Sequence, residues 1–518
     1  MNQTKTDILI IGVGLAGMTA AITAAKSGKK ITMLTKTQSL VSGNTPWAQG
    51  GVVYQGLNDS SDKLKQDILK AGDGHCWEDA VNHLCKYGPR LVKEILIDTL
   101  KTPFDVNSED RTLKRVAEGA HSDARVIYNQ DKTGASIHKA AINYLEQLDN
   151  VTILTDHTAI DLLTFSHHST ESTDIYKKPA CFGAMVLNNK TNEVIPILSS
   201  KTILATGGLG QLFLHTTNPK EATGDGIAMA WRAGARCFNL HYIQFHPTSL
   251  YHPSGRFLIS EALRGEGAKL VNAQGEEFMT QYHKLGALAP RDVVSRAIHM
   301  QMIKESEDCM FLDITHKDSD WIKNRFPTIY EHCLSKGIDI TNEIIPVVPA
   351  AHYSCGGVGV NLVGKTSLKR LYAIGEISCS GLHGANRLAS TSLLECLVWG
   401  YFSGKDAVEA YDDGDYFPPI EAWKQGDKNV DPSHIAQEWF AIKNTMWNLA
   451  GLIRSQDKLH SAMHILRNLQ SDVEKFYQNS RLDKNIIALR NGAQTALAII
   501  ASSIESRESR GTHYVSEE

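Results

Sequence analysis

The segment Asp7-Ile8-Leu9-Ile10-Ile11-Gly12-Val13-Gly14-Leu15-Ala16-Gly17, near the start of the chain, decides the fold. The four isoleucine and leucine residues predict a buried strand, the glycines predict a tight turn, and the alanine-rich stretch that follows predicts a helix. A second apolar run at residues 31–34 completes a βαβ unit of about 30 residues. Gly12 would make the turn, Gly14 would let a pyrophosphate approach the backbone, and Gly17 would let the helix pack on the strand. The segment therefore predicts a dinucleotide-binding site.

The end of the second strand departs from the usual pattern for such a site. An Asp or Glu commonly binds the ribose hydroxyls there, but this chain has Thr35 and Lys36. We therefore expect the ribose to be contacted differently. The next loop is either a plain surface loop or, as we favour, a source of backbone N–H groups for a cofactor. It contains Ser42, Gly43, Asn44, Thr45, Pro46, Trp47, Ala48, Gln49, Gly50 and Gly51.

Later segments extend and interrupt this unit. Residues 201–208 and 371–376 each read as a strand that ends in a glycine turn, and we expect both to join the first sheet. A mixed region of strands and helices lies between them. The prediction is an α/β fold in which a Rossmann-like FAD-binding domain, residues 1–238 plus 354–417, is interrupted by an α+β capping domain, residues 239–353.

The chain changes character after the segment Tyr416-Phe417-Pro418-Pro419. Apolar residues then recur at alternating steps of three and four, first from Ile435 to Ile453 and again in two later runs. This period is typical of amphipathic helices that bury one face. Residues 418–518 are therefore predicted to form a C-terminal helical bundle.

Composition excludes several classes of protein. The 518 residues include 53 Lys+Arg and 57 Asp+Glu, so no basic excess indicates a nucleic-acid partner or an anionic membrane. No apolar run approaches the ~18–20 residues of a membrane span, and the first residues do not resemble a signal peptide. The nine cysteines are scattered without a Cys-x-x-Cys pair, which argues against a disulfide framework and against a metal site. We expect a cytoplasmic protein without a bound metal.

Histidines and arginines in glycine- and alanine-rich surroundings are the candidate catalytic groups. His246 lies in Gln244-Phe245-His246-Pro247-Thr248, His352 follows two alanines, and Arg387 ends His383-Gly384-Ala385-Asn386-Arg387. A single His is more often a packed residue than a catalytic one. Together, however, imidazole and guanidinium groups suit a substrate with two carboxylates, because Arg binds a carboxylate through two parallel hydrogen bonds.

Arg291 follows Pro290, a residue common at helix starts, so we expect Arg291 in the first turn of a helix. A cation there opposes the helix dipole at a cost of about 0.3–1 kcal/mol. An exposed Arg that reaches solvent is one interpretation. The other is a guanidinium that meets an anion beside the free N–H groups of the helix.

Nine sequence blocks occur in the order of one known family. They are Gly12-x-Gly14-x-x-Gly17, Ala48-Gln49-Gly50-Gly51, Ala205-Thr206-Gly207-Gly208, Thr223-Gly224-Asp225-Gly226, Gln244-Phe245-His246-Pro247-Thr248, Arg264-Gly265-Glu266-Gly267, Pro290-Arg291-Asp292, His383-Gly384-Ala385-Asn386-Arg387 and Glu508-Ser509-Arg510-Gly511. From end to end the chain resembles the FAD-linked succinate dehydrogenase/fumarate reductase flavoprotein superfamily. Within that superfamily it most resembles the L-aspartate oxidase family.

Two features favour that branch. Respiratory members carry a His that is bonded covalently to FAD, and the corresponding residue here is Asn44, so the resemblance implies non-covalent FAD. The segment Glu118-Gly119-Ala120-His121-Ser122-Asp123-Ala124-Arg125 is similar to the oxidase pattern Glu-Gly-Gly-His-Ser-x-x-Arg, with Ala120 in place of a Gly. The resemblance implies that Glu118 faces the substrate ammonium, a group that succinate lacks.

The resemblance also implies a reaction. L-Aspartate would be oxidised to iminoaspartate, and oxygen (giving hydrogen peroxide) or fumarate would reoxidise the flavin, as the first step of NAD biosynthesis through quinolinate. Iminoaspartate could pass directly to quinolinate synthase. Arg291 would be the proton-transfer residue, although an Arg is normally never deprotonated; its helix-start position in a desolvated site would favour loss of the proton.

Roles carry over residue by residue. Catalytic roles are expected for Glu118, His246, Arg291 and His352, and substrate contacts for Gln244, Ser260, Glu261, His352 and Arg387. Cofactor contacts are expected for residues 12–17, Lys36, residues 44–51, Asp225, Glu376, Ser392 and Leu393.

Three alternatives stay open at this point. Asn44 does not exclude a soluble fumarate reductase or succinate dehydrogenase-type flavoprotein. Glu118 disfavours it, because succinate has no ammonium group for this carboxylate to bind. An NAD(P)-linked dehydrogenase would need a second glycine-rich fingerprint of comparable quality, and the chain has none. A non-catalytic flavin scaffold or an RNA-modification partner would leave the histidines and arginines unexplained.

Overall fold

A central sheet carries the predicted nucleotide-binding unit. The computed structural model describes residues 4–429 and 431–516. Its first three elements are β1 (Thr4–Ile11), α1 (Leu15–Ala25) and β2 (Ile31–Leu34). β1 and β2 are parallel neighbours, and the isoleucine-rich half of β1 is buried. The βαβ prediction is therefore confirmed.

The described part of this sheet has seven strands in the order β6-β2-β1-β9-β8-β7, with β16 also paired to β9. The additional strands are β6 (Val151–Leu154), β7 (His157–Thr164), β8 (Cys181–Asn188), β9 (Glu193–Leu204) and β16 (Leu371–Ala373). β9 and β16 are the two later strands that the sequence predicted, and both are parallel to their neighbours in the nucleotide unit. The antiparallel pair β7–β8 was not predicted from the sequence.

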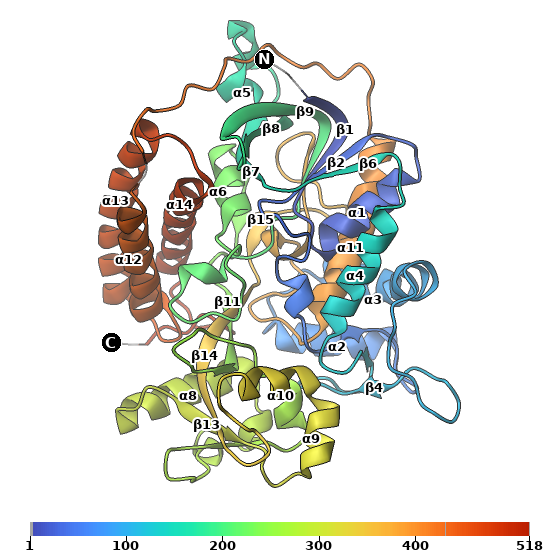
Figure 1. The fold of residues 1–518 in the computed structure, drawn as a ribbon, viewed down its shortest axis with the longest axis vertical. Helices are drawn as coiled ribbons and strands as arrows, with labels where there is room; N and C mark the ends of the chain where they lie inside the picture. Colours follow the sequence, from blue (N-terminus) through green and yellow to red (C-terminus); the bar gives the residue numbers. More distant parts are fainter. Residues whose placement is uncertain (1–3, 430, 517–518) are drawn as a thin grey trace.

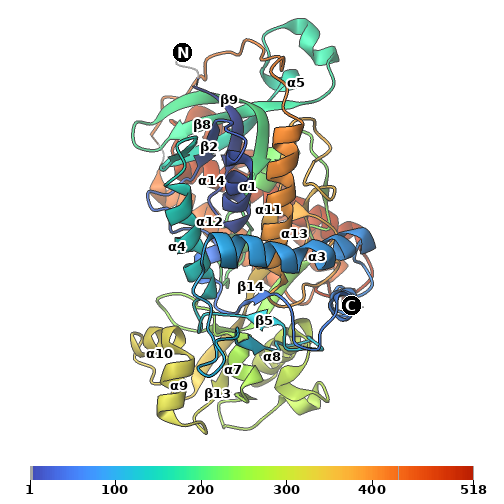
Figure 2. The same ribbon diagram turned by 90° about the vertical axis from the view of Figure 1, so that its right-hand side faces the viewer.

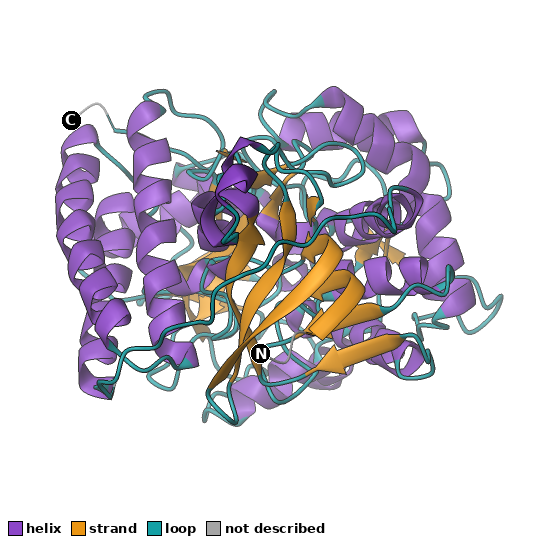
Figure 3. Cartoon of the chain, turned by 90° about the horizontal axis from the view of Figure 1, so that it is seen from above, coloured by secondary structure: helices purple, strands orange, loops and turns teal. Residues whose placement is uncertain are grey.

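Helices cover both faces of the central sheet (Figures 1 and 3). One group contains α1, α2 (Ser61–Ala71), α3 (Glu78–Leu91), a π-helix (Val92–Thr99), α4 (Thr133–Leu145) and α11 (Thr391–Glu409). α1 and α11 lie side by side in Figures 1 and 2. Glycines permit this close approach: a Cβ at Gly404 would lie 2.5 Å from the carbonyl oxygen of Ala20. The other face carries α6 (Asp225–Arg232), against which the C-terminal helices pack.

A second, antiparallel sheet lies below the first in Figure 1. Its strands run in the order β11-β14-β13-β12, with bounds β11 (Ile243–Leu250), β12 (Lys269–Val271), β13 (Met310–Asp313) and β14 (Ile345–Ser354). It packs with its own apolar core against α7 (Glu261–Gly265), α8 (Arg291–Glu305), α9 (Ser319–Arg325) and α10 (Pro327–Leu334). This is the predicted α+β insertion.

The chain leaves and re-enters the nucleotide domain through neighbouring strands. β10 (Cys237–Phe238) pairs antiparallel with β15 (Gly357–Gly359), which in turn pairs with β17 (Ser378–Cys379). A fourth sheet consists of β3 (Val52–Val53), β4 (Arg115–Val116) and β5 (Val126–Ile127). The predicted limits 239–353 fall close to the β10–β15 pair, and the domain limits as a whole stay a prediction.

Three long helices follow residue 431, as the apolar period predicted. They are α12 (Pro432–Ala450), α13 (Gln456–Asn479) and α14 (Lys484–Glu505). Figure 1 shows them beside α6, and their apolar faces join one core with the central sheet. α12 ends before Ile453, where the periodic pattern was predicted to end, and Gly451 follows its last residue. In the described residues, no helix is both long and apolar enough to cross a membrane.

Gly17 provides a test of the close packing in the nucleotide unit. A Cβ at Gly17 would lie 2.4 Å from the carbonyl oxygen of Gly12, which is backbone and cannot easily move. We expect Gly17→Ala to lower the free energy of unfolding by about 1–3 kcal/mol and to reduce the nucleotide content of the purified protein, because the turn must shift. Thermal unfolding and the absorbance of the released nucleotide would measure both effects.

Gly28→Ala is the matched control. Gly28, unlike Gly17, has a positive φ (+75°), and nothing lies within 4 Å of an added Cβ. It should therefore lose about 1–2 kcal/mol of stability through backbone strain alone and retain its nucleotide. Equal nucleotide loss in both variants would contradict the steric explanation.

Candidate active site

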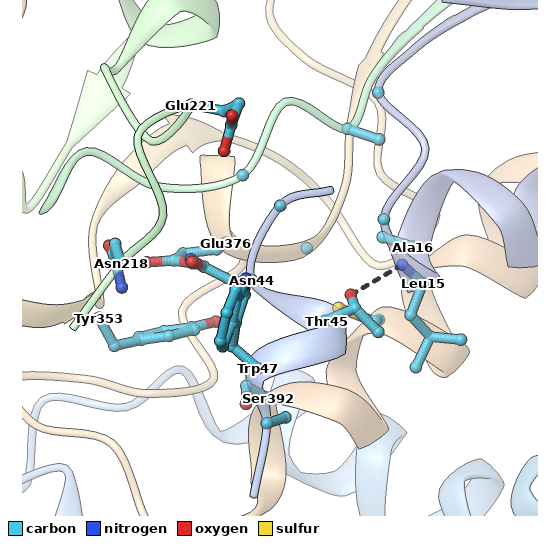
Figure 4. Close-up of a pocket in the computed structure, with 18 of the residues that line it drawn as sticks. Leu15, Ala16, Asn44, Thr45, Trp47, Asn218, Glu221, Tyr353, Glu376 and Ser392 are labelled. Atoms are coloured by element: carbon cyan, nitrogen blue, oxygen red, sulfur yellow. Dashed lines mark hydrogen bonds between the residues drawn. The ribbon is translucent and has the colours of Figure 1, made fainter. Parts of the chain in front are cut away.

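The turn between β1 and α1 forms a cradle for a diphosphate. Gly12 has φ +120°, and a Cβ there would lie 2.1 Å from the carbonyl oxygen of Ala205, so only glycine fits. α1 begins without a side-chain cap and without an acidic residue in its first turn. The Leu15 N–H donates to Thr45 Oγ1 at 3.1 Å (Figure 4), and the adjacent helix start faces the cavity. Such a helix start binds anions through its free N–H groups and its dipole.

A single large cavity extends from this cradle to the second sheet. Its lining runs from Gly12 in the turn between β1 and α1 to His246 and His352 on strands of the second sheet. A site that joins a diphosphate cradle to a second group of polar side chains suits a dinucleotide together with a small substrate. The predicted cofactor residues that line it are Gly12, Val13, Gly14, Leu15, Ala16, Lys36, Asn44, Thr45, Trp47, Ala48, Gln49, Gly50, Gly51, Asp225, Glu376, Ser392 and Leu393.

Two predicted cofactor residues lie outside the lining of the cavity. Gly17 packs behind the turn against Gly12, as its helix-packing role requires. Pro46 lies in the short 3-10 helix Thr45–Trp47, whose neighbouring residues face the cavity instead. A direct contact of either residue with the cofactor therefore finds no support in this geometry.

The acidic residue missing after β2 is supplied from elsewhere in the chain. Lys36 Nζ lies 2.6 Å from a carboxylate oxygen of Asp225, the first residue of α6, and 2.9 Å from Thr223 Oγ1. Lys36 and Asp225 both line the cavity. An ion pair between two segments thus occupies the place where one acidic side chain was expected.

Asn44 is paired with a buried carboxyl group. Asn44 Nδ2 donates to Glu376 Oε2 at 2.7 Å, and the two residues are labelled in Figure 4. The Ser354 N–H donates to Glu376 Oε1 at 3.1 Å. Burial raises the pKa of Glu376 to about 7 although both hydrogen bonds lower it. The amide of Asn44 offers no nucleophile, so this wall of the cavity suits a cofactor held without a covalent bond.

The opposite end of the cavity collects the four predicted cationic and imidazole side chains. His246 and His352 face each other with ring centroids 5.2 Å apart, and Arg291 and Arg387 lie beside them. Burial lowers the pKa of His246 well below its usual value, and the charge of Arg291 lowers it further. Burial and the neighbouring His246 likewise lower the pKa of His352 well below its usual value. Both imidazoles are therefore neutral at pH 7 and can donate a hydrogen bond to a carboxylate.

Gln244 holds the two arginines and does not line the cavity. Its Oε1 accepts from Arg291 Nη1 and from Arg387 Nη2, each at 3.1 Å. Its Nε2 donates to Asn386 Oδ1 at 2.6 Å and to the Arg387 carbonyl at 2.9 Å. Because the amide is fully buried and occupied on both sides, the geometry contradicts the predicted contact of Gln244 with the substrate.

Glu261 also holds an arginine side chain, that of Arg291. Its Oε2 accepts from Arg291 Nε at 2.5 Å, and its Oε1 lies 3.6 Å from Arg264. Burial raises the pKa of the Glu261 carboxyl, but the charges of Arg291 and Arg264 outweigh burial and bring that pKa down to about 2. Arg291, the first residue of α8 as predicted, thus meets an anion from its own chain. This ion pair holds the Arg291 guanidinium in place beside the cavity.

Arg387 rests on an aromatic ring. Its guanidinium lies 4.3 Å from the ring centroid of Tyr353, and its Nη1 donates to Ser392 Oγ at 2.8 Å. The Tyr353 hydroxyl donates to the buried carboxylate of Glu395 at 2.8 Å. Among the described residues, Arg387 Nε has no hydrogen-bond partner, so the Arg387 guanidinium remains available to a ligand anion.

Glu118 also faces this end of the cavity. Its Oε2 accepts from Ser390 Oγ at 2.6 Å, and no Lys, Arg or His of the described chain forms an ion pair with it. The Ser260 hydroxyl lines the cavity at the start of α7. Several other lining residues were not selected from the sequence: Thr217, Asn218, Glu221, Tyr353 and Ser390. Glu221, just before the Thr223 block, Tyr353, beside His352, and Ser390, between Arg387 and Ser392, lie close enough to a motif to have been found.

Comparison with known proteins assigns the chain to a family. The model of the FAD binding domain family matches residues 7–393, and that of the fumarate reductase flavoprotein C-terminal family matches residues 440–517. The chain is 41% identical to L-aspartate oxidase 1 of Ralstonia nicotianae over 515 residues, covering 98% of this chain and 94% of that protein. It is also 41% identical to the L-aspartate oxidase of Pseudomonas aeruginosa over 518 residues, with the same coverage of both chains.

Solved structures agree with this assignment. A mutated E. coli quinol fumarate reductase superposes with a TM-score of 0.89 at 26% identity, covering 100% of this chain and 92% of that one. The α/β architecture with a C-terminal helical region is therefore confirmed, as is FAD as the cofactor type. The chain belongs to the L-aspartate oxidase family, within the FAD-binding flavoproteins related to fumarate reductase.

Proposed function

We propose that this chain oxidises the Cα–N bond of L-aspartate to give iminoaspartate, the first step of NAD biosynthesis through quinolinate. The observation that carries the proposal is the arrangement at one end of the cavity. Two arginines and two neutral histidines suit the two carboxylates of a substrate, and a carboxylate without a cationic partner, Glu118, faces the same space. FAD, when bound, supplies the two-electron acceptor, which oxygen or fumarate regenerates.

Different residues would recognise the carboxylates and the ammonium group of such a substrate. Arg387 would bind one carboxylate through its free N–H groups, and Ser260, His246 and His352 would donate to the carboxylates. Glu118 would pair with the ammonium and thereby fix which face of Cα is presented. Arg291 would transfer the proton, with Glu261 holding its guanidinium in place.

A soluble fumarate reductase is the second candidate, because the fold resembles quinol fumarate reductase. The higher identity to aspartate oxidases, 41% against 26%, favours the first. A plain dicarboxylate would also leave the charge of Glu118 unpaired. Cytoplasmic location and direct transfer of iminoaspartate to quinolinate synthase are further parts of the proposal.

FAD is expected to leave the protein intact on denaturation, because Asn44 stands where other members carry the anchoring His. Precipitation with acid should leave the flavin in the supernatant, where its absorbance can be measured. Flavin that remains with the precipitated chain would show a covalent bond and would contradict the non-covalent assignment.

Glu118→Gln should distinguish amino from plain dicarboxylates. The ammonium loses a charged partner worth about 1.5–3 kcal/mol, so oxidation of L-aspartate should fall by about one to two orders of magnitude. Fumarate has no ammonium, so its reduction should be largely retained. Stopped-flow rates of flavin reduction and reoxidation measure the two reactions.

The control for Glu118→Gln is Glu109→Gln, which removes an exposed carboxylate upstream in the same connecting segment. It should change neither reaction. An equal loss of both activities in Glu118→Gln would indicate that Glu118 only maintains the structure.

Arg387→Lys and Arg291→Lys should fail in different ways. Lys retains the charge but loses the two-pronged contact, so Arg387→Lys should raise KM for L-aspartate about tenfold to a hundredfold. Arg291→Lys should instead lower turnover by about 10²–10⁴-fold while succinate still binds, because proton transfer is affected. Raising the pH should recover part of this rate, since Lys deprotonates more readily than Arg. Flavin reduction in Arg291→Lys as fast as in the parent would assign Arg291 to binding alone.

A further inference from the structure

Glu118 is held in the cavity by one hydroxyl group. Ser390 Oγ donates to Glu118 Oε2 at 2.6 Å and accepts the Gly51 N–H at 3.3 Å, so its proton is directed to the carboxylate. Space for Glu118 exists because Gly50 lacks a side chain: a Cβ there would lie 2.7 Å from Glu118 Oε1. Ser390 has φ +55° at the start of α11, an uncommon conformation that persists when the surrounding structure requires it.

His121 joins the same two segments a second time. His121 Nε2 lies 3.0 Å from the carbonyl oxygen of Ala389, which can only accept, so Nε2 carries a hydrogen. His121 Nδ1 lies 3.1 Å from Arg125 Nη1, which can only donate, so Nδ1 is bare. Both nitrogens of a neutral imidazole are therefore used, and a protonated ring would oppose the Arg125 N–H. Burial lowers the pKa of His121, which agrees with this assignment.

Arg125 fixes His121 from behind. Its guanidinium is fully buried and binds Asp59 through two hydrogen bonds, of 2.8 and 2.9 Å. It also donates to Asp67 Oδ2 at 2.5 Å. Asp67, on α2, in turn accepts the N–H and the hydroxyl of Ser122. This well-satisfied ion-pair cluster anchors the 118–125 segment to the protein body.

The backbone of the 118–125 segment is strained at one position. Ala120 has φ +67°, in the left-handed region that glycine adopts without cost. This explains why the oxidase pattern has a Gly at that position. The turn brings Glu118 and His121 toward Ser390 and Ala389 together, so two hydrogen bonds fasten one short segment to the start of α11.

We propose that Ser390 and His121 are positioning residues for Glu118, and that they set the preference of this site for dicarboxylates that also carry an ammonium group. The proposal rests on the proposed function, because it concerns the same cavity and the same substrate class. Neither side chain needs to touch the substrate. Each acts by fixing where the Glu118 carboxylate lies.

Two rates measured on the same protein, with L-aspartate and with fumarate, test the proposal. FAD-loaded parent, Ser390→Ala and His121→Ala are compared by stopped flow for flavin reduction by L-aspartate and for reoxidation of the reduced flavin by fumarate. We expect the aspartate rate to fall about tenfold in each variant and the fumarate rate to stay within about threefold of the parent. His121→Gln, which retains an N–H donor for the Ala389 carbonyl, should recover most of the loss.

Binding without turnover gives an independent measurement. α-Methyl-L-aspartate has no hydrogen on Cα and cannot be oxidised there, and 2-methylsuccinate matches it without the ammonium. Isothermal titration of the FAD-loaded proteins should show that the affinity ratio of the two ligands falls about tenfold in Ser390→Ala and His121→Ala. If the parent is not reduced by L-aspartate, the proposed function is wrong, and this ratio alone then decides the positioning role.

Ser403→Ala is the control, because Ser403 is a buried serine within α11 whose hydroxyl donates to a carbonyl, that of Val363, away from Glu118. It should leave both ratios unchanged. Equal losses for ligands with and without the ammonium would show that Ser390 and His121 are structural only. Unchanged ratios would show that Glu118 is held without them. Either result overturns the proposal.

Discussion

Two guanidinium groups lie close together at one end of the cavity, and the rest of the site depends on how their hydrogen bonds are satisfied. Gln244 places its amide oxygen between Arg291 and Arg387, and its amide nitrogen donates to the Asn386 side chain and to the Arg387 carbonyl. A carboxylate at the position of Gln244 would pair with both arginines and compete with an anionic ligand. A neutral acceptor satisfies one hydrogen bond of each arginine and adds no negative charge between them.

The same constraint explains where the acidic groups lie. Glu261 is paired with Arg291, while Arg387 has an aromatic ring beneath it instead of a carboxylate. Glu395 lies one layer behind that ring, where it accepts from Tyr353, His383 and Ser380. Negative charge therefore approaches Arg291 closely and Arg387 only indirectly. This difference is consistent with separate roles for the two arginines, one in proton transfer and one in binding.

The cavity itself exists only because two sheets meet. The central sheet supplies the glycine turn and the start of α1, and the second sheet supplies His246 from β11 and His352 from β14. β11 and β14 are antiparallel neighbours, and their pairing places the two imidazole rings edge-on to each other, with centroids 5.2 Å apart. Arg387 and Ser390 come from the segment before α11, which packs on α1. One packed unit thus aligns the cofactor end and the substrate end of the cavity.

The sequence by itself determined the features that arise from local pattern. Glycine spacing and apolar runs were sufficient for the β1–α1–β2 unit, and the three-and-four period was sufficient for α12–α14, because both follow from neighbours in the chain. The glycines of the turn between β1 and α1 likewise indicated a close approach of the backbone. The motifs also identified His246, Arg291, His352 and Arg387, but without their mutual distances.

The tertiary structure decided which contacts those residues make with one another. Gln244 holds two arginines, Asp225 pairs with Lys36 at the end of β2, and Ser390 meets Glu118 from 272 residues away. Such contacts depend on how separate elements pack, and no period or spacing within one segment encodes them.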